Sequence, residues 1–291
     1  MRNKKPSAPS TEATRDCLEY VKGQINFARR TSDEPAPEAD LLRRLPDMLF
    51  GHIHEQPPLL SYDITIRNAR PIVNQLSLER EGFTLVQREL RCLTERDPEI
   101  LYDRYLEEMV PYIKKSFDAS WVEVRRQTLI LRSAAGSSAP TMKEPIALAH
   151  TDYAPIAGPV VAAIASQSQG IPVRSYSRLM IIQTWHALSP PPQDFPLAIC
   201  DGASVRDSDI DVVDYTVHNY SFKMGIVRFN PAQRWYYFPE MTTDEFILFK
   251  SYDSDARCNP QTPHSAFDNR RAHPSARARE SLEARFFVYY A

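Results

Sequence analysis

Short runs of apolar, β-branched and aromatic residues fill the chain after Trp121 and predict a mainly β structure. The runs are WVEVRRQTLILR, IALAHTDY, RLMIIQTWHAL, PLAIC, YTVHNYSF, GIVRF, RWYYF, EFILFKSY and EARFFVYY. No helical pattern between them is long enough to connect two parallel strands, which favours antiparallel pairing. We therefore predict an antiparallel barrel or jelly roll.

The N-terminal part of the chain predicts less regular structure. Leu18, Val21 and Ile25 recur at helical spacing and predict a weak helix, and the stretch SDEPAPEAD that follows is typical of a linker. We therefore assign residues 1–45 to an N-terminal arm and linker, and residues 46–291 to a single barrel domain.

Further elements are predicted between the linker and the β-rich region. Apolar and polar residues alternate from Tyr62 to Ile66, and an apolar run covers Phe83 to Val86, so both segments predict strands. Asp97 can cap a helix that begins at Pro98. Apolar residues line one face of this helix, namely Tyr102, Leu106, Met109 and Ile113. We expect the N-terminal 120 residues, including these helices, to pack outside the barrel.

Charge and hydropathy argue against two classes of partner. Lys and Arg number 35 against 37 Asp and Glu, a net charge of -2, so no overall positive field is available to hold nucleic acid. No apolar stretch approaches the about 18 residues of a membrane-spanning helix. The basic N-terminus is followed by no apolar segment of a secretory signal. We expect a cytoplasmic protein with neither a membrane nor a nucleic-acid partner.

Cysteine and glycine usage argues against other kinds of site. Cys17, Cys92, Cys200 and Cys258 form no Cys-x-x-Cys pair, which argues against a zinc knuckle and a disulfide scaffold. We expect reduced, mostly buried thiols. The chain has 8 glycines and no glycine-rich loop, which disfavours nucleotide-dependent phosphoryl transfer.

A candidate metal site begins with His150 and Asp152 in the run IALAHTDY. One residue separates them, so on a strand both side chains point to the same face. His264, after the run EFILFKSY, can supply a third ligand. Two imidazoles and one carboxylate form the facial triad of non-heme Fe(II) oxygenases, which leaves adjacent positions open for co-substrate and O₂.

A candidate anion site lies close to the last apolar run. Arg279 and Ser281 form an Arg-x-Ser pair just before it. A guanidinium grips a carboxylate with two charge-assisted hydrogen bonds, and a neighbouring hydroxyl can add a third. This chemistry fits the distal carboxylate of 2-oxoglutarate. Arg285 shares the strand face and is the alternative anchor.

The chain resembles a known family over most of its length, from about YDITIRNAR through SLEREGFTL to the C-terminus. The stretch RFNPAQRWYYFPEMTTDEFILFKSYDSDARCNPQTPHSAF, followed by RESLEAR, is similar to the fungal gibberellin-desaturase-like and AsaB-type hydroxylase/desaturase family, which is related to CmcJ. The motifs RWYYFPEMT and YDS are its most specific part.

The resemblance implies a double-stranded β-helix, a cupin-like jelly roll, that uses Fe(II), 2-oxoglutarate and O₂. Its members hydroxylate, desaturate or cyclise small molecules in secondary-metabolite biosynthesis. By position, the metal ligands would be His150, Asp152 and His264, and the 2-oxoglutarate would be held by Arg279 and Ser281.

One strand departs from the family pattern. Where the family commonly has Asn-x-Trp-Arg, this chain has Gln183, Thr184, Trp185 and His186. Strand alternation sends Gln183 and Trp185 to one face and the other two to the opposite face. We expect Gln183 and Trp185 to face inward as substrate-binding residues, because a neutral amide beside Fe(II) avoids a competing imidazole.

Other interpretations remain open at the level of sequence. His150 and Asp152 can form a simple hydrogen-bonded pair, and Arg279 can form a surface salt bridge with Glu280 or Glu283. The His52-x-His54 pair is expected to have a structural or solvent-exposed role.

Two alternative functions also remain. One is an iron and O₂ oxidase that does not use 2-oxoglutarate. The other is a non-catalytic subunit that supports a related oxygenase as a heterodimer, although its usual sign is a broken triad. A homodimer is also compatible with the sequence.

Overall fold

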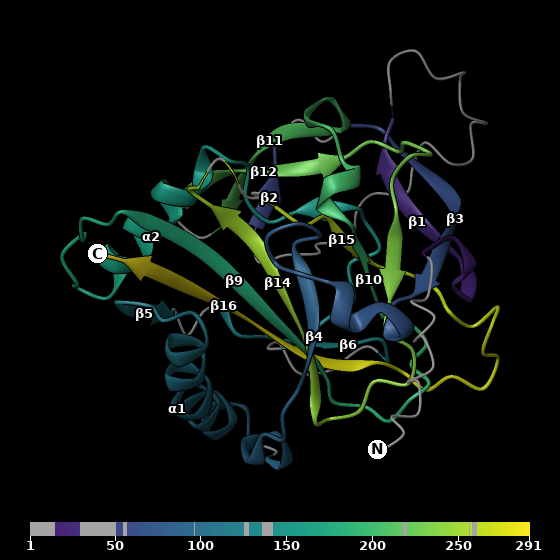
Figure 1. Cartoon of the computed structure of the whole chain (residues 1–291), viewed down its shortest axis with the longest axis horizontal. Helices are drawn as coiled ribbons and strands as arrows, with labels where there is room; N and C mark the ends of the chain where they lie inside the picture. The colour runs from purple at the N-terminus through teal and green to yellow at the C-terminus, as the bar shows by residue number, and fades with distance from the viewer. Residues whose placement is uncertain are drawn as a thin grey trace, which may run out of the picture.

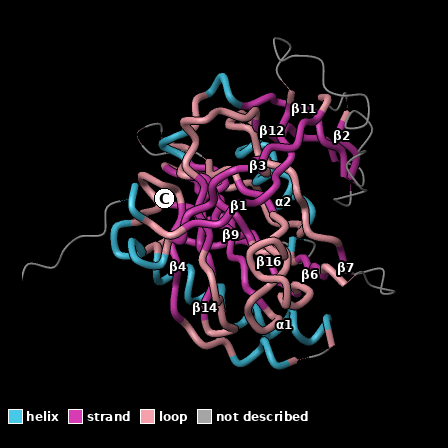
Figure 2. Tube along the Cα trace, turned by 90° about the vertical axis from the view of Figure 1, so that its right-hand side faces the viewer, coloured by secondary structure: helices cyan, strands magenta, loops and turns pink. Residues whose placement is uncertain are grey.

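The computed structural model describes residues 15–29, 51–54, 57–95, 97–124, 128–135, 142–217, 220–255, 257 and 261–291. Within these residues, two curled β-sheets of nine and seven strands carry the fold, and helices lie at their periphery (Figures 1 and 2). The predicted mainly β, double-stranded β-helix fold is confirmed.

The nine-stranded sheet has the order β1-β3-β13-β10-β15-β8-β12-β11-β2. Its strands are β1 (Tyr20–Ala28), β2 (Gly51–Ile53), β3 (Leu59–Asn68), β8 (His150–Thr151), β10 (Leu197–Cys200), β11 (Ile210–Val217), β12 (Tyr220–Val227), β13 (Trp235–Tyr237) and β15 (His264–Ala266). Its pairs are antiparallel except for β13 with β3. The short strands β8 and β15 bring the first and last predicted metal ligands into one sheet.

The seven-stranded sheet has the order β4-β14-β9-β16-β6-β7, and β5 also pairs with β16. Its strands are β4 (Phe83–Gln87), β5 (Trp121–Val124), β6 (Ile130–Ser133), β7 (Met142–Lys143), β9 (Arg178–Ala187), β14 (Glu245–Asp253) and β16 (Glu280–Tyr290). Figure 1 shows β9, β14 and β16 side by side. Nearly every residue of these three strands is buried, because both faces of the sheet are covered. Their continuous apolar sequences follow from this burial.

Two α-helices cover the seven-stranded sheet. Helix α1 (Pro98–Ser116) begins as predicted, because the Asp97 side chain accepts hydrogen bonds from the first turn. Its buried face, which includes Tyr105 and Met109, packs with β16 residues in one apolar cluster. Helix α2 (Ala157–Ser168) was not predicted. Its sequence AGPVVAAIASQS lacks charges and has no clear apolar face, so it gives little periodic signal.

Short 3-10 helices complete the described elements: η1 (Arg15–Cys17), η2 (Arg70–Gln75), η3 (Arg91–Thr94), η5 (Gly202–Ser204) and η6 (Asp207–Asp209). No helix among the described residues is long and apolar enough to cross a membrane. Cys92 and Cys200 are buried free thiols and Cys17 is an exposed one, whereas Cys258 lies outside the described residues.

The helix predicted around Leu18, Val21 and Ile25 is wrong, because Tyr20–Ala28 form strand β1. This strand pairs with β3 along its whole length, from Tyr20 opposite Arg67 to Ala28 opposite Leu59. Val21, Ile25 and Phe27 also fit a two-residue period, and β-branched side chains favour strands. Tertiary pairing therefore outweighs the ambiguous spacing.

The prediction that the N-terminal elements lie outside the barrel holds for α1 but not for the early strands. β1, β2 and β3 join the nine-stranded sheet, and β4 joins the seven-stranded sheet. The run YTVHNYSF is not one strand, since it spans the end of β11 and the start of β12. Its residues 218–219 lie outside the described residues.

Candidate metal centre

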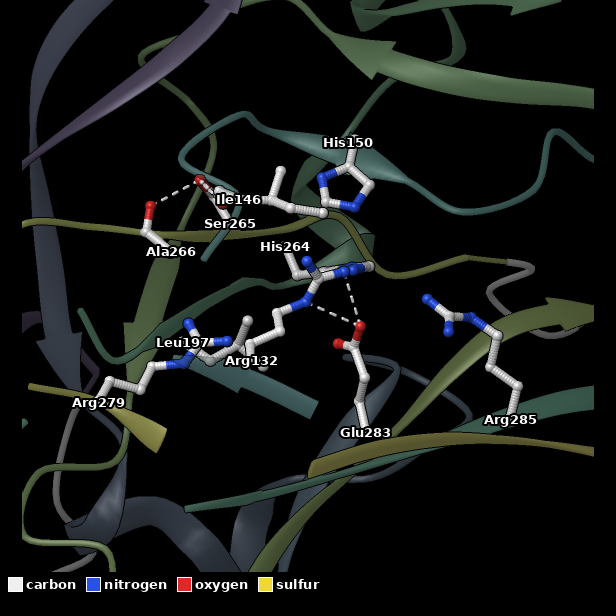
Figure 3. Close-up of a pocket in the computed structure, with 10 residues that line it drawn as sticks. All are labelled: Arg132, Ile146, His150, Leu197, His264, Ser265, Ala266, Arg279, Glu283 and Arg285. Carbon is white, nitrogen blue, oxygen red and sulfur yellow. Dashed lines mark hydrogen bonds and ion pairs between the residues drawn. The ribbon is translucent and has the colours of Figure 1, made fainter. Parts of the chain in front are cut away.

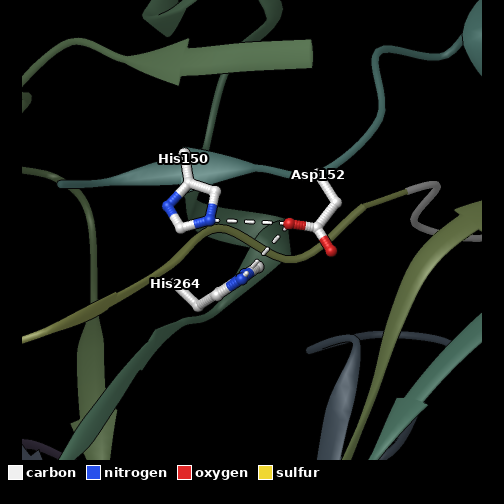
Figure 4. A group of neighbouring side chains, drawn as sticks. All are labelled: His150, Asp152 and His264. Atoms are coloured by element: carbon white, nitrogen blue, oxygen red, sulfur yellow. Dashed lines mark ion pairs between the residues drawn. The ribbon is translucent and has the colours of Figure 1, made fainter. Parts of the chain in front are cut away.

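Strands β8 and β15 bring His150 and His264 directly opposite each other as a cross-strand pair. Asp152 follows β8 and turns its carboxylate towards both rings (Figure 4). Its Oδ1 atom lies 3.5 Å from His150 Nε2 and 3.8 Å from His264 Nε2. One ligand atom from each residue lies within 4.8 Å of the others, and all three side chains are buried or nearly so.

The hydrogen bonds of the two imidazoles fix which nitrogen faces the triad. His150 Nδ1 lies 2.7 Å from the Leu148 carbonyl, and His264 Nδ1 lies 3.1 Å from the Thr262 carbonyl. Because a carbonyl only accepts, each Nδ1 carries the proton and each Nε2 keeps a free lone pair. Such backbone contacts are the usual supports of metal-binding histidines.

Electrostatics keep His264 and Asp152 in the protonation states that a metal requires. Burial, and then the neighbouring His150, lower the pKa of His264 to about 4. Burial alone would raise the pKa of Asp152, but Arg285, His150 and His264 outweigh it and lower this pKa well below its usual value. Two imidazole nitrogens and one carboxylate oxygen are donors that suit a divalent transition metal.

The second carboxylate oxygen of Asp152 is held by the protein. Its Oδ2 atom accepts a hydrogen bond of 2.6 Å from Arg285 Nε and another from Gln183 Nε2. Gln183 Nε2 also donates to Ser251 Oγ at 2.5 Å. Arg285, the alternative 2-oxoglutarate anchor, is therefore paired with a predicted metal ligand.

A small cavity, partly open to solvent, lies beside the two histidines (Figure 3). Its lining combines three guanidinium groups, one carboxylate, the two imidazoles and a few small or apolar side chains. The lining residues are Arg132, Ile146, His150, Leu197, His264, Ser265, Ala266, Arg279, Glu283 and Arg285. The cavity is thus both cationic and adjacent to the triad.

The charges in this cavity are paired except for Arg279. Arg132 donates to Glu283 Oε1 at 3.0 Å through Nε and 2.8 Å through Nη2, and Arg285 is paired with Asp152. Among the described residues, no carboxylate lies within ion-pair distance of the Arg279 guanidinium. The alternative of a surface salt bridge between Arg279 and Glu280 or Glu283 does not hold in the structure, since Arg279 is only 2% exposed.

Neutral groups hold the Arg279 guanidinium in place. Its Nε donates to Ser281 Oγ at 3.0 Å, its Nη1 donates to the Phe195 carbonyl at 2.9 Å, and it lies 5.0 Å from the centre of the Trp185 ring. Burial, and then the charge of Arg132, lower the pKa of Arg279 to about 9. The guanidinium is cationic at neutral pH, and its buried charge favours binding of an anion.

The two faces of β9 differ as strand alternation predicts. Gln183 contacts Asp152 and Trp185 lies under Arg279, whereas Thr184 and His186 lie on the opposite face and contact Tyr105. Tyr105 Oη is 2.6 Å from Thr184 Oγ1 and 2.8 Å from His186 Nε2. Burial lowers the pKa of His186 to about 3, so it is a neutral core residue away from the cavity.

Arg132 and Ser251 were not among the predicted site residues, and Glu283 was expected only as a partner in a surface salt bridge. A signal for Glu283 existed, because it lies two residues before Arg285 on β16 and four residues after Arg279, which directly precedes that strand. Arg132 is a charge within the apolar run ILRS. Their mutual contacts depend on the pairing of β6 with β16.

Among the described residues, the triad is the only such cluster of His, Cys, Asp and Glu. Of the second histidine pair, the side chain of His52 lies outside the described part of the chain. His54 is exposed, and its Nε2 atom lies 2.8 Å from Thr216 Oγ1.

The chain is similar to a known family model and to named fungal enzymes. Residues 26–289 match the family model described as "Oxidoreductase/YMDC permease-like domain". The hydroxylase/desaturase efuI of Hormonema carpetanum is 30% identical over 251 residues, which cover 78% of this chain and 83% of that protein. The Fe(II)/2-oxoglutarate-dependent dioxygenase nvfI of Aspergillus novofumigatus is 23% identical over 242 residues, again 78% of this chain and 83% of the relative.

A solved structure has the same fold. The iron and alpha-ketoglutarate-dependent endoperoxidase NvfI superposes with a TM-score of 0.72 and 21% sequence identity, covering 94% of this chain and 98% of the other. The curled sheets described above are therefore those of a known oxygenase fold.

Proposed function

Because the chain belongs to the family of fungal hydroxylase/desaturases and Fe(II)/2-oxoglutarate-dependent dioxygenases, we propose that His150, Asp152 and His264 hold its iron. As a member of that family, the protein is a non-heme iron, 2-oxoglutarate-dependent dioxygenase. It hydroxylates, desaturates or cyclises a small molecule in secondary-metabolite biosynthesis.

The observation that carries the metal assignment is the convergence of three buried donor atoms of suitable chemistry. His150 Nε2, His264 Nε2 and Asp152 Oδ1 face one another, and both histidines are fixed by backbone carbonyls. When bound, Fe(II) with 2-oxoglutarate and O₂ supplies the oxidising chemistry. The triad occupies one side of the site and leaves the cavity side for ligands.

We propose that Arg279 and Ser281 hold the distal carboxylate of 2-oxoglutarate. Arg279 is the one guanidinium of the cavity lining that has no carboxylate partner among the described residues. Ser281 Oγ accepts from Arg279 Nε, which orients the guanidinium and keeps the hydroxyl beside it. Arg285 is favoured less, because Asp152 already occupies its Nε.

The contacts of Gln183 and Trp185 support a revision of their predicted substrate-binding roles. Gln183 donates to Asp152, and Trp185 lies against the Arg279 guanidinium. We propose that both residues support the groups that hold iron and 2-oxoglutarate.

We also propose one domain that includes β1, in place of a division at residue 46, because β1 pairs along its length with β3. A cytoplasmic location and assembly as a homodimer, or as a heterodimer with a related subunit, remain proposals. Localisation of a tagged protein and light scattering would test them.

The decisive experiment replaces Asp152 by Ala. We expect reconstituted Asp152→Ala to lose most of its bound iron, because the only anionic ligand is removed. Metal analysis measures this loss, and release of succinate from 2-oxoglutarate distinguishes this enzyme from an oxidase that uses iron and O₂ alone. Full iron content and turnover in Asp152→Ala would refute the triad.

A further inference from the structure

We propose that Gln183 is a positioning residue for the metal ligand Asp152. Its amide, together with Arg285, holds Oδ2 so that Oδ1 alone is presented to the metal. The inference rests on the proposed function, because it takes His150, Asp152 and His264 as the ligands.

The two oxygens of Asp152 have different surroundings. Oδ1 faces His150 Nε2 at 3.5 Å and His264 Nε2 at 3.8 Å. Oδ2 points the other way and accepts hydrogen bonds from Arg285 Nε and Gln183 Nε2. A carboxylate oxygen that already accepts two hydrogen bonds is a poor second donor to a metal. The protein therefore selects coordination through one oxygen, which leaves one more position open for other ligands.

The orientation of the Gln183 amide follows from its partners. A carboxylate only accepts, so Nε2 and not Oε1 must face Asp152. The same Nε2 donates to Ser251 Oγ at 2.5 Å, which fixes the amide from the neighbouring strand. Gln183 Oε1 is buried and has no hydrogen-bond partner among the described residues. Leaving this oxygen unsatisfied costs free energy. The hydrogen bonds of Gln183 are made by Nε2 alone, on the side of Asp152.

The supporting residues come from three adjacent strands of one sheet. Gln183 in β9 lies opposite Arg285 in β16 and opposite Phe249 in β14, two residues before Ser251. Paired, fully buried strands hold side chains more rigidly than loops do. Asp152 itself lies after the short strand β8, so strand pairing does little to hold it in place. The side chains of Gln183 and Arg285 from the neighbouring sheet hold its carboxylate instead.

Gln183 gives a cleaner test than Arg285. Removal of Arg285 also removes a positive charge beside the metal, and this change by itself would strengthen cation binding. Gln183 is neutral, so its replacement removes the hydrogen bond to Asp152 without changing the charge near the metal. Gln183→Met keeps the length of the side chain without a donor, and Gln183→Asn keeps the amide but shortens its reach.

The experiment is a titration of the metal-free full-length protein with Mn(II), followed by electron paramagnetic resonance. We expect Gln183→Met and Gln183→Asn to bind Mn(II) about 10- to 100-fold more weakly than the wild type, as is usual for residues that orient a ligand. Ser251→Ala should lose less affinity, because the bond from Gln183 to Asp152 remains.

Thr184→Val is the matched control, because Thr184 is the next residue of β9 but contacts Tyr105 on the opposite face. It should keep wild-type affinity for Mn(II). Melting temperatures of the metal-free proteins identify any variant that fails to fold, in which case the other Gln183 variant decides the test.

The outcomes separate this inference from the function on which it rests. Mn(II) affinity of a folded Gln183 variant within about twofold of the wild type, with loss of binding in Asp152→Ala, would overturn the role of Gln183 alone. Wild-type Mn(II) affinity in Asp152→Ala would overturn the metal site itself. An equal loss in Thr184→Val would also contradict the inference, since it would point to a general disturbance of β9.

Discussion

Replacement of Arg279 by Ala tests how the cavity recognises its anionic co-substrate. Arg279 is 2% exposed, and its guanidinium donates to Ser281 Oγ and the Phe195 carbonyl and has no carboxylate partner among the described residues. Within the described part of the chain, the side-chain hydrogen bonds of Arg279 thus go to neutral groups. The variant removes the cation while the three metal ligands keep their own contacts.

The size of the effect follows from the interaction that is lost. A hydrogen bond to a charged group contributes about 1.5–3 kcal/mol, and truncation of one member of a buried charge pair costs about 2–5 kcal/mol. A loss of about 3 kcal/mol corresponds to roughly 150-fold weaker binding of 2-oxoglutarate, since about 1.4 kcal/mol is a factor of ten. Iron affinity should stay unchanged, because the Arg279 side chain contacts no member of the triad.

The assay is calorimetric titration of 2-oxoglutarate into the anaerobic Mn(II)-loaded protein. Arg279→Lys is the matched variant, because it keeps a positive charge but loses the planar fork. Added guanidinium ions should restore part of the affinity of Arg279→Ala, by occupying the space that the side chain leaves.

Two results would refute this reasoning. One is an unchanged affinity of Arg279→Ala for 2-oxoglutarate. The other is a loss seen in metal-loaded Arg285→Ala and absent from Arg279→Ala, which would transfer the anchoring role to Arg285.

Three further predictions concern stability. Burial lowers the pKa of His186 to about 3, against 6.5 for a free histidine, so the unfolded chain binds the proton first as the pH falls. The stability due to neutral His186 is full above pH 6.5 and is lost as the pH falls towards 3. From pH 7.5 to 5.5, the free energy of unfolding measured in urea should therefore fall by about 1.4 kcal/mol more in the wild type than in His186→Gln. Equal decreases in the two proteins would contradict this. Gly158→Ala should destabilise the fold by about 1–3 kcal/mol in thermal unfolding, although alanine favours helices, because its Cβ would lie 2.5 Å from the Tyr252 ring; a stabilised variant would show that the ring moves freely. Tyr105→Phe should cost about 1–3 kcal/mol in the same assay, since Thr184 and His186 lose their shared partner, and an unchanged melting temperature would argue against that contact.

The sequence was sufficient for the parts of the fold with a strong local pattern. The runs that form β9, β14 and β16 are apolar, β-branched and aromatic, so they predict buried strands directly. Asp97 and Pro98 predict the start of α1 for the same local reason. β1 and α2 were missed because their spacing is ambiguous, and tertiary pairing or packing decides their conformation.

In the candidate site, too, the features with a local sequence pattern could be predicted and the others could not. The one-residue spacing of His150 and Asp152 is local, and strand alternation separates Gln183 from His186. The partners of the arginines are not local. Arg279 directly precedes β16 and Arg285 lies within it, and only the positions of Asp152 and Glu283 relative to them show which guanidinium lacks a carboxylate partner among the described residues. Periodicity cannot supply this information.

The direct pairing of His150 with His264 also affects how the protein folds. The strands β9 to β14 lie between these residues in the sequence, so closing the pair has a high loop-closure entropy cost and a high contact order. The metal site should therefore form late, after β9 and β14 have paired. During refolding, metal uptake would report the last steps of assembly, and excess metal should mainly slow unfolding.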